Sequence, residues 1–382
     1  MTAVTRLAGG SIATPEGTLD QVDVLVAEGR IIDLVAPDAR VDIADGVIDV
    51  TDRIVAPGLI DMQINGGWGG DFTGNPCSIS EVAARLPSTG VTAFMPTIVT
   101  SSPAQRQAAF EALADLETGP DAASALGLHF EGPIISPNRP GAHNPKYIGV
   151  PSPAEIDTWT RRRGVAIITL APEVSGATEL ISRLADQGIV VSAGHTECSA
   201  VEFATARAAG VSMVTHLFNA MAPFSHREPG PIGATLADES VFVSIICDGI
   251  HIDPVAVRMA YRALGPARTI LVSDAVAALG LTDGTVLLGD LNVTVSERGV
   301  RTSDDVLAGS NLALDQAIRN LVRFTGCSPA QAIRAATTNP AQVLGLTDRG
   351  RVQVGCVADL VVFDRNLELE LTIIGGHTTW KS

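Results

Sequence analysis

Short apolar runs alternate with alanine-rich segments of helical period through the middle of the chain. Runs that alternate with helices in this way are typical of strand-helix-strand units and a parallel sheet. Eight such strands predict a closed (β/α)8 barrel over residues 58–344, with an open doubly wound sheet as the alternative. The eight runs are GLIDMQI, VTAFMPTIV, ALGLHFE, VAIITLAP, IVVSAGH, SMVTHLF, VFVSIICD and TILVSDA.

The two ends of the chain have a different pattern, in which apolar and polar positions alternate. This alternation runs through VDVLVAEGRIIDLV and GVIDVTDRIV near the start and returns in VGCVADLVVFDRNLELELTIIGG near the end. It is typical of half-buried antiparallel strands. We therefore expect residues 1–57 and 345–382 to meet in one small β-sandwich domain that the barrel interrupts. A further hairpin is predicted in DGTVLLGDLNVTVSERGV, after the eighth run.

The composition is that of a compact globular protein. Hydrophobic residues make up 46% of the 382 positions and charged residues 18%, which excludes a disordered chain. The formal net charge of -16 repels nucleic acids and anionic membranes, so neither is an expected partner. No run reaches the roughly 18 apolar residues of a membrane span, and the first residues lack an apolar signal core, so we expect a cytoplasmic protein. The five scattered cysteines form no CxxC pair and are expected to be reduced core thiols.

Polar residues follow most of the apolar runs, and in a barrel enzyme the chemistry lies at the carboxyl ends of the strands. They are Gln63 and Asn65 after the first run, Glu131 after the third, His195 after the fifth, His216 after the sixth, Asp248 and His251 after the seventh, and Asp274 after the eighth. We expect these side chains to gather at one edge of the barrel.

Glu131, His195 and His216 are the strongest group among them. A carboxylate and two imidazoles are the three protein ligands of an open catalytic metal site, with water in the remaining position. A single histidine at a strand end is more often structural, but burying three ionisable groups together without a compensating charge is costly. We therefore predict a divalent metal ion. The ligand set suits zinc, and iron, cobalt and manganese stay open.

Asp274 ends the eighth run in LVSDA and would face the same metal site. A carboxylate beside a metal-bound water is placed to accept its proton, so we predict Asp274 as the general base. The alternative roles for this residue are a helix cap or an ion-pair partner.

A second candidate site would bind an anion. Arg227 and His226 lie in the loop after the sixth run, and His251 follows the seventh. Together with backbone amides at Asn219 and Ala220, they could hold a phosphate and locally reverse the sign of an acidic protein. The alternative is an exposed Arg227 with a purely structural role.

Several motifs resemble the amidohydrolase superfamily and, within it, most closely the N-acetylglucosamine-6-phosphate deacetylases. The matching motifs, in order, are HFEGP at 129–133, GAHNP at 141–145, SAGHT at 192–196, THLFNAM at 215–221, REPG at 227–230, DGIH at 248–251 and SDA at 273–275. The resemblance covers nearly the whole chain, including the split β domain.

The resemblance implies a role for each motif residue. It implies that Glu131, His195 and His216 bind the metal, that Asp274 is the catalytic base and acid, and that His143 donates to the acetamide oxygen. It further implies that the sugar phosphate is held by Asn219, Ala220, Arg227 and His251, and that the sugar is lined by Ala142, Leu307, Ala308 and Gly309. In that family Arg227 would reach the site from the neighbouring subunit of a homodimer.

The sequence differs from the superfamily pattern at two positions, and this difference argues for a single metal ion. Many members of the superfamily carry His-x-His after the first strand, and here Gln63 and Asn65 occupy those positions. Neutral amides are poor metal ligands beside imidazole, so the chain resembles the single-metal branch.

These observations lead to a functional hypothesis. The enzyme hydrolyses N-acetyl-D-glucosamine 6-phosphate to D-glucosamine 6-phosphate and acetate, a reaction of amino-sugar metabolism, with a metal-bound water as nucleophile and Asp274 as base and then acid. The rivals are an amidohydrolase for a different N-acetylated sugar or a cyclic amide, and a catalytically silent barrel scaffold.

Overall fold

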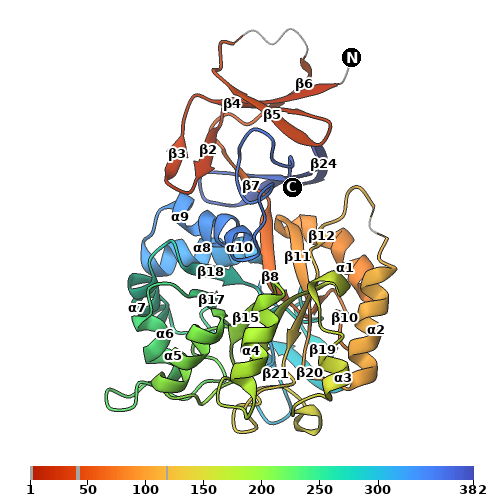
Figure 1. Cartoon of the computed structure of the whole chain (residues 1–382). Helices are drawn as coiled ribbons and strands as arrows, with labels where there is room; N and C mark the ends of the chain where they lie inside the picture. Colours follow the sequence, from red (N-terminus) through yellow and green to blue (C-terminus); the bar gives the residue numbers. More distant parts are fainter. Residues whose placement is uncertain (1–2, 40–43, 118) are drawn as a thin grey trace.

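The computed structural model describes residues 3–39, 44–117 and 119–382. A barrel surrounded by helices makes up most of the molecule, and two small β-sheets lie beyond one end of it (Figure 1). Within the described ranges, no helix combines the length and the apolar character that a membrane crossing needs.

Eight parallel strands form the barrel wall, and each corresponds to one of the predicted runs. In six of them every residue is buried, because helices cover the outer face and side chains fill the interior. The strands are β8 (Leu59–Ile64), β11 (Val91–Ile98), β13 (Leu128–Glu131), β14 (Val165–Leu170), β15 (Val190–Ala193), β16 (Val211–Val214), β17 (Phe242–Ile246) and β18 (Thr269–Val272). A short strand, β12 (Ser124–Ala125), pairs with β11 outside this series.

The barrel closes between its first and last strands. Ile64 and Ala275 form a parallel bridge, and the Asp274 amide donates to the Gln63 carbonyl at 2.9 Å. The predicted (β/α)8 barrel is therefore confirmed, and the open-sheet alternative is wrong.

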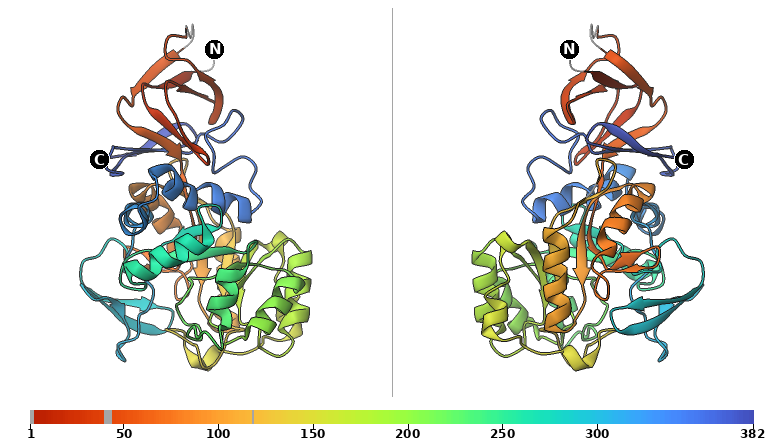
Figure 2. Two further views of the ribbon diagram at one scale, coloured as in Figure 1. Left: turned by 90° about the vertical axis from the view of Figure 1, so that its left-hand side faces the viewer. Right: turned by 90° about the vertical axis from the view of Figure 1, so that its right-hand side faces the viewer.

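Helices pack around the outside of the barrel (Figure 2). In α8, for example, Leu314, Ile318 and Leu321 are buried at spacings of four and three residues, which places them on one face of the helix. The helices are α1 (Ser78–Arg85), α2 (Pro103–Ala114), α3 (Pro153–Ile156), α4 (Ala177–Asp186), α5 (Ala200–Ala209), α6 (Gly230–Ala237), α7 (Pro254–Leu264), α8 (Leu314–Thr325), α9 (Pro329–Ala335) and α10 (Thr338–Val343). Short 3-10 turns are η1 (Leu86–Thr89), η2 (Pro145–Tyr147) and η3 (Arg161–Arg163).

Both ends of the chain contribute to the β sandwich. One sheet has the order β5-β4-β1-β6 and the other the order β24-β23-β22-β7-β2-β3. Apolar side chains from both sheets, including Leu7, Val24, Ile12 and Val362, form one buried cluster between them. The strands are β1 (Val4–Ala8), β2 (Ser11–Thr14), β3 (Gly17–Leu19), β4 (Asp23–Ala27), β5 (Arg30–Val35), β6 (Ala44–Asp49), β7 (Ile54–Pro57), β22 (Leu360–Phe363), β23 (Leu369–Ile374) and β24 (His377–Lys381).

Gly58 alone separates β7 of the sandwich from β8 of the barrel. A Cβ atom there would lie 2.1 Å from the Thr92 Oγ1 atom, so the close approach requires glycine. The domain limits at 57/58 and 344/345 stay predictions from the sequence.

The predicted hairpin after the eighth strand is present as a three-stranded sheet. It comprises β19 (Gly284–Leu288), β20 (Leu291–Ser296) and β21 (Gly299–Arg301). A second small ribbon, β9 (Gly66–Gly67) with β10 (Gly70–Asp71), contains the glycine-rich turn after β8. The hairpin lies at the end of the barrel away from the β sandwich (Figure 1).

Trp159 tests the packing of the barrel core. Its side chain is 0% exposed, and its ring centroid lies 5.4 Å from that of Phe130 on β13. Because truncation leaves a large cavity, we expect Trp159→Ala to lower the free energy of unfolding by about 3–5 kcal/mol in urea denaturation followed by circular dichroism. Phe224, which is 59% exposed, provides the control, and Phe224→Ala should change the value by less than about 0.5 kcal/mol. Equal effects of the two changes would contradict this account of the core.

Candidate metal centre and active site

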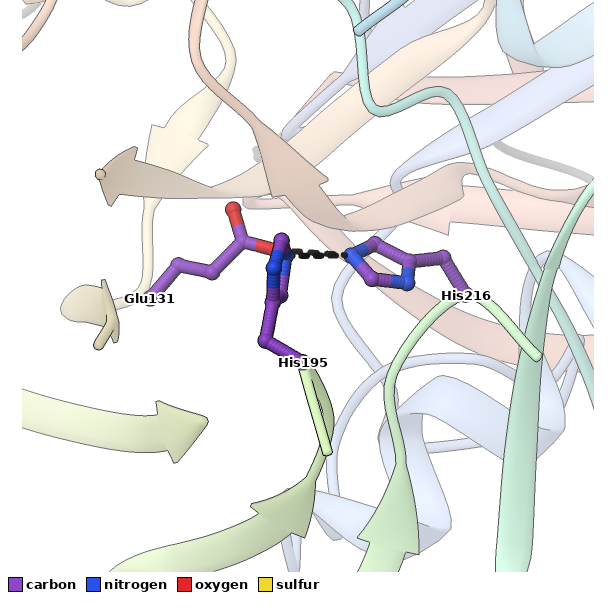
Figure 3. A group of neighbouring side chains, drawn as sticks. All are labelled: Glu131, His195 and His216. Atoms are coloured by element: carbon purple, nitrogen blue, oxygen red, sulfur yellow. Dashed lines mark hydrogen bonds and ion pairs between the residues drawn. The ribbon is translucent and has the colours of Figure 1, made fainter. Parts of the chain in front are cut away.

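Four predicted site residues lie at the carboxyl ends of barrel strands. Glu131 is the last residue of β13, while His195, His216 and Asp274 each stand two residues beyond the end of β15, β16 and β18. All four side chains are buried. Figure 3 shows the side chains of Glu131, His195 and His216 pointing toward one another from three different strands.

One carboxylate oxygen and two ring nitrogens converge in this group. Glu131 Oε1 lies 2.9 Å from His216 Nε2 and 3.3 Å from His195 Nε2, and the two nitrogens are 3.2 Å apart. His195 Nδ1 lies 2.9 Å from the Arg139 carbonyl oxygen, which can only accept, so the ring hydrogen of a neutral His195 is on Nδ1 and its Nε2 carries a lone pair. A carboxylate and an imidazole lone pair at this separation attract a cation.

The electrostatics of the group agree with this geometry. Burial lowers the pKa of His195 to about 4, so this ring is neutral at pH 7. Burial opposes ionisation of Glu131, but hydrogen bonds with His143, His195 and His216 hold its pKa well below the ordinary value. Burial lowers the pKa of His216, but the hydrogen bond and charge of Glu131 outweigh it and raise the pKa above the ordinary value. Its Nδ1 is buried without a hydrogen-bond partner in the described chain. This donor set fits a divalent metal ion.

Asp274 is held beside this group by two side-chain amides. Asn65 Nδ2 donates to Asp274 Oδ1 at 2.8 Å, and Gln63 Nε2 donates both to Asp274 Oδ1 at 3.1 Å and to Glu131 Oε1 at 3.0 Å. Burial raises the pKa of Asp274 to about 6, with a further contribution from the charge of Glu131. Gln63 and Asn65 therefore act here as hydrogen-bond donors to carboxylates.

His143 reaches the same place from the loop after β13. Its Nε2 lies 3.6 Å from Glu131 Oε2, and its Nδ1 lies 2.7 Å from the Thr100 hydroxyl oxygen. When the Thr100 hydroxyl donates to Nδ1, a neutral His143 carries its hydrogen on Nε2, the atom next to Glu131. His143 can therefore present a hydrogen-bond donor at the metal centre.

The backbone at the site adopts conformations that non-glycine residues rarely take. The φ angles of His195, His216, Ala220 and Asp274 are 49°, 31°, 49° and 48°. Each such residue costs on the order of 1–3 kcal/mol, and such strain gathers at functional sites. It turns these side chains toward the common centre directly after straight strands.

A cavity of about 170 Å³ opens above the four residues. Among the residues predicted to contact substrate, Ala142, His143, Asn219, Ala220, His251, Leu307 and Gly309 line it. The apolar residues Val99, Ile246, Leu288 and Val306 also line it, and the sequence analysis missed them because an apolar residue next to a strand is indistinguishable from core.

Two predicted contacts are not part of this cavity wall. Ala308 is fully buried in an apolar cluster with Val276 and Val293 and is absent from the cavity wall, although its neighbours Leu307 and Gly309 line it. Arg227 is exposed in the loop before α6, its guanidinium makes no hydrogen bond or ion pair with a described residue, and it does not line the cavity. A single chain therefore does not bring Arg227 to the cavity.

The predicted anion site is partly assembled. His251 Nδ1 lies 2.7 Å from Asp248 Oδ2, which leaves Nε2 available to a ligand, and the Ala220 N–H makes no hydrogen bond within the described residues. The Asn219 amide group already donates to the carbonyls of His216 and Leu217, at 3.1 and 3.3 Å. Of the two backbone amides named from the sequence, Ala220 is thus the free donor, since the Asn219 N–H donates to the His216 carbonyl.

Comparison with known proteins places this site in a family. The sequence matches the amidohydrolase family over residues 54–379. The N-acetylglucosamine-6-phosphate deacetylase of Mus musculus is 40% identical over 388 residues, covering 96% of this chain and 93% of the relative. That of Bacillus subtilis (strain 168) is 39% identical over 340 residues, covering 87% of this chain and 86% of the relative.

The chain belongs to the amidohydrolase family. The crystal structure of N-acetylglucosamine-6-phosphate deacetylase from Thermotoga maritima matches this amidohydrolase with a TM-score of 0.89 at 36% identity, covering 99% of this chain and 100% of that one. An aspartate-to-alanine mutant of the Mycobacterium smegmatis N-acetyl-D-glucosamine-6-phosphate deacetylase, in complex with N-acetyl-D-glucosamine-6-phosphate, matches with a TM-score of 0.89 at 32% identity and covers 99% of both chains. The resemblance seen in the sequence motifs is confirmed.

The metal centre makes a prediction about stability. We expect Zn²⁺ to raise the unfolding temperature of the chelator-treated amidohydrolase, because a cation that binds only the folded chain adds about 2.7 kcal/mol at 100 times its Kd. Glu131→Gln should remove most of this increase, since it removes the ionised ligand. Exposed Glu179 on α4 provides the matched control, and Glu179→Gln should keep the full increase. Thermal scans at several zinc concentrations measure the effect. A wild-type unfolding temperature that does not change with zinc concentration would contradict a metal centre here.

Proposed function

We propose that this amidohydrolase cleaves N-acetyl-D-glucosamine 6-phosphate by hydrolysis to D-glucosamine 6-phosphate and acetate. The observation that carries the proposal is the convergence of Glu131, His195 and His216 beside a buried Asp274, at the base of a cavity. The names of the relatives support the substrate, since those aligned over nearly the full chain are N-acetylglucosamine-6-phosphate deacetylases.

Glu131, His195 and His216 would hold one divalent metal ion, and zinc is the metal that their donor atoms suit best. When bound, such an ion supplies Lewis acidity, which lowers the pKa of water from 15.7 toward about 7. Gln63 and Asn65 supply amide N–H groups where many relatives in the superfamily have histidines, which supports a single ion.

Asp274 would move the proton that the reaction requires. Its carboxylate, with a pKa raised to about 6, takes a proton from the attacking water at neutral pH. The same carboxyl then gives that proton to the departing nitrogen, because an amine cannot leave as an anion. The amides of Gln63 and Asn65 fix its Oδ1 atom during both transfers.

His143 would donate from Nε2 to the acetamide oxygen as negative charge develops there. In this tautomer His143 Nδ1 accepts from the Thr100 hydroxyl at 2.7 Å, and the hydroxyl oxygen lies 3.2 Å from the Glu131 carbonyl oxygen. Thr100 therefore lies beside both the donor and the metal ligand.

The phosphate would lie at the other side of the cavity. The free Ala220 N–H is a donor suited to an anion, and His251 can donate from Nε2 in its imidazolium form, since its Nδ1–H is directed at Asp248. Asn219 lies beside them, and Ala142, Leu307 and Gly309 line the cavity around the sugar. We infer that Arg227 completes this site from the second subunit of a homodimer, because within one chain its exposed guanidinium makes no hydrogen bond or ion pair with a described residue and does not line the cavity. A cytoplasmic location is part of the same proposal.

Asp274→Asn tests the proton transfer. The amide oxygen of asparagine can still accept from Gln63 and Asn65, so the fold and the zinc content should be kept. Without a titrating carboxyl, the rate of acetate release from N-acetyl-D-glucosamine 6-phosphate should fall at least about 100-fold. Asp283→Asn, at an exposed position, serves as the control. Near-native turnover by Asp274→Asn would refute the role.

Arg227→Ala tests the anion site. Because a charge-assisted contact remote from the reacting bond contributes to binding, KM for the phosphorylated sugar should rise about tenfold or more with a smaller change in kcat. Arg162→Ala, which removes another exposed arginine, should leave KM unchanged. Kinetics with N-acetyl-D-glucosamine and its 6-phosphate complete the test. Equal use of both sugars by the wild-type enzyme would favour a different amidohydrolase substrate.

A further inference from the structure

The loop from Ser136 to His143 is docked against the segment that carries His195. The Ser136 N–H donates to the His195 carbonyl at 2.9 Å, and His195 Nδ1–H donates to the Arg139 carbonyl at 2.9 Å. The loop thus holds both the main chain and the ring of one metal ligand. The same loop ends in His143, the donor beside Glu131.

Glu197 binds this loop through both of its carboxylate oxygens. Oε2 accepts from Asn138 Nδ2 at 2.8 Å, and Oε1 accepts from Arg139 Nε at 3.0 Å and lies 2.9 Å from Arg139 Nη2. Arg139 is therefore held at two points, its side chain by Glu197 and its carbonyl by the His195 ring.

Glu173, which follows β14, fixes Glu197 in turn. Its Oε1 accepts from the Glu197 N–H at 2.6 Å, and its Oε2 accepts from the Thr196 hydroxyl at 2.5 Å. The segment directly after His195 is thus tied to the neighbouring strand end before it turns into α5.

We propose that Glu197 is a positioning residue for the metal centre, which holds the Ser136–His143 loop so that the Arg139 carbonyl keeps His195 with its Nε2 lone pair toward the metal. The inference rests on the metal centre of the proposed function. Groups that orient a ligating histidine in this way typically change metal affinity 10–100-fold when they are removed.

A purely structural role would have a different consequence. The Glu197 and Arg139 side chains are each 32% exposed, and ion pairs that are exposed to this extent contribute little to folding. Loss of Glu197 should therefore leave the metal-free protein folded. It should lower the affinity for the metal ion and the rate of catalysis.

The test compares zinc affinity in three variants. Chelator competition should show Zn²⁺ binding weakened about 10–100-fold in Glu197→Ala, and less in Glu197→Gln, whose amide oxygen can still accept from Arg139 but whose NH2 group cannot accept from Asn138. The control is Glu370→Ala, which breaks the Arg53–Glu370 pair of similar exposure, 40% and 33%, in the β sandwich. It should bind zinc like the wild type. At limiting zinc, kcat should fall in the same order as the zinc affinity. The unfolding temperatures of the chelator-treated variants should equal that of the chelator-treated wild type.

Wild-type zinc affinity in Glu197→Ala would overturn the inference, and so would an equal loss of affinity in Glu370→Ala. A large drop in the unfolding temperature of chelator-treated Glu197→Ala would assign the residue a structural role instead. If the wild type binds zinc but releases no acetate, the proposed substrate fails, and the affinity comparison still decides the role of Glu197.

Discussion

The functional site depends on one electrostatic constraint, which is that Glu131 and two imidazoles are buried within hydrogen-bonding distance of one another. Burying an ionised carboxylate is costly unless charge or donors compensate it. A cation compensates it directly. Asp274 adds a second carboxyl to the same region, and the amides of Gln63 and Asn65 stabilise its anionic form without adding charge.

The barrel is what makes this arrangement possible. Residues as distant in sequence as Glu131 and Asp274 come close together because the carboxyl ends of all the parallel strands of the barrel lie at one edge. The strained φ angles of His195, His216 and Asp274 stand immediately after three of those strands, where the ladder of backbone hydrogen bonds on either side can support them. The hydrogen-bonded strands therefore stabilise the strained residues that follow them.

The sequence predicts the wall and its polar ends well, for physical reasons. Strands buried on both faces read as continuous apolar runs, and a histidine or glutamate directly after such a run stands out against them. The cavity lining was harder to predict. Val99 and Leu288 cannot be distinguished from core residues in the sequence, and Ala308 is absent from the cavity wall although both its neighbours line it. The donor role of Gln63 depends on the positions of two carboxylates from other strands. The link from Glu197 to His195 passes through a loop conformation that no sequence period encodes.

The net charge of -16 does not conflict with an anionic substrate. At physiological ionic strength the Debye length is about 8 Å, so exposed carboxylates farther away than this are largely screened from the cavity. The electrostatic environment of a phosphate in the cavity is determined by the nearest groups. These include the free Ala220 N–H and His251 Nε2, which has no partner among the described residues. The backbone N–H is a neutral donor, and His251 donates from Nε2 only in its imidazolium form, so a guanidinium supplied at the mouth would add a fixed positive charge to this site. Arg227, which is exposed and close in sequence to Ala220, is the residue proposed to supply this guanidinium.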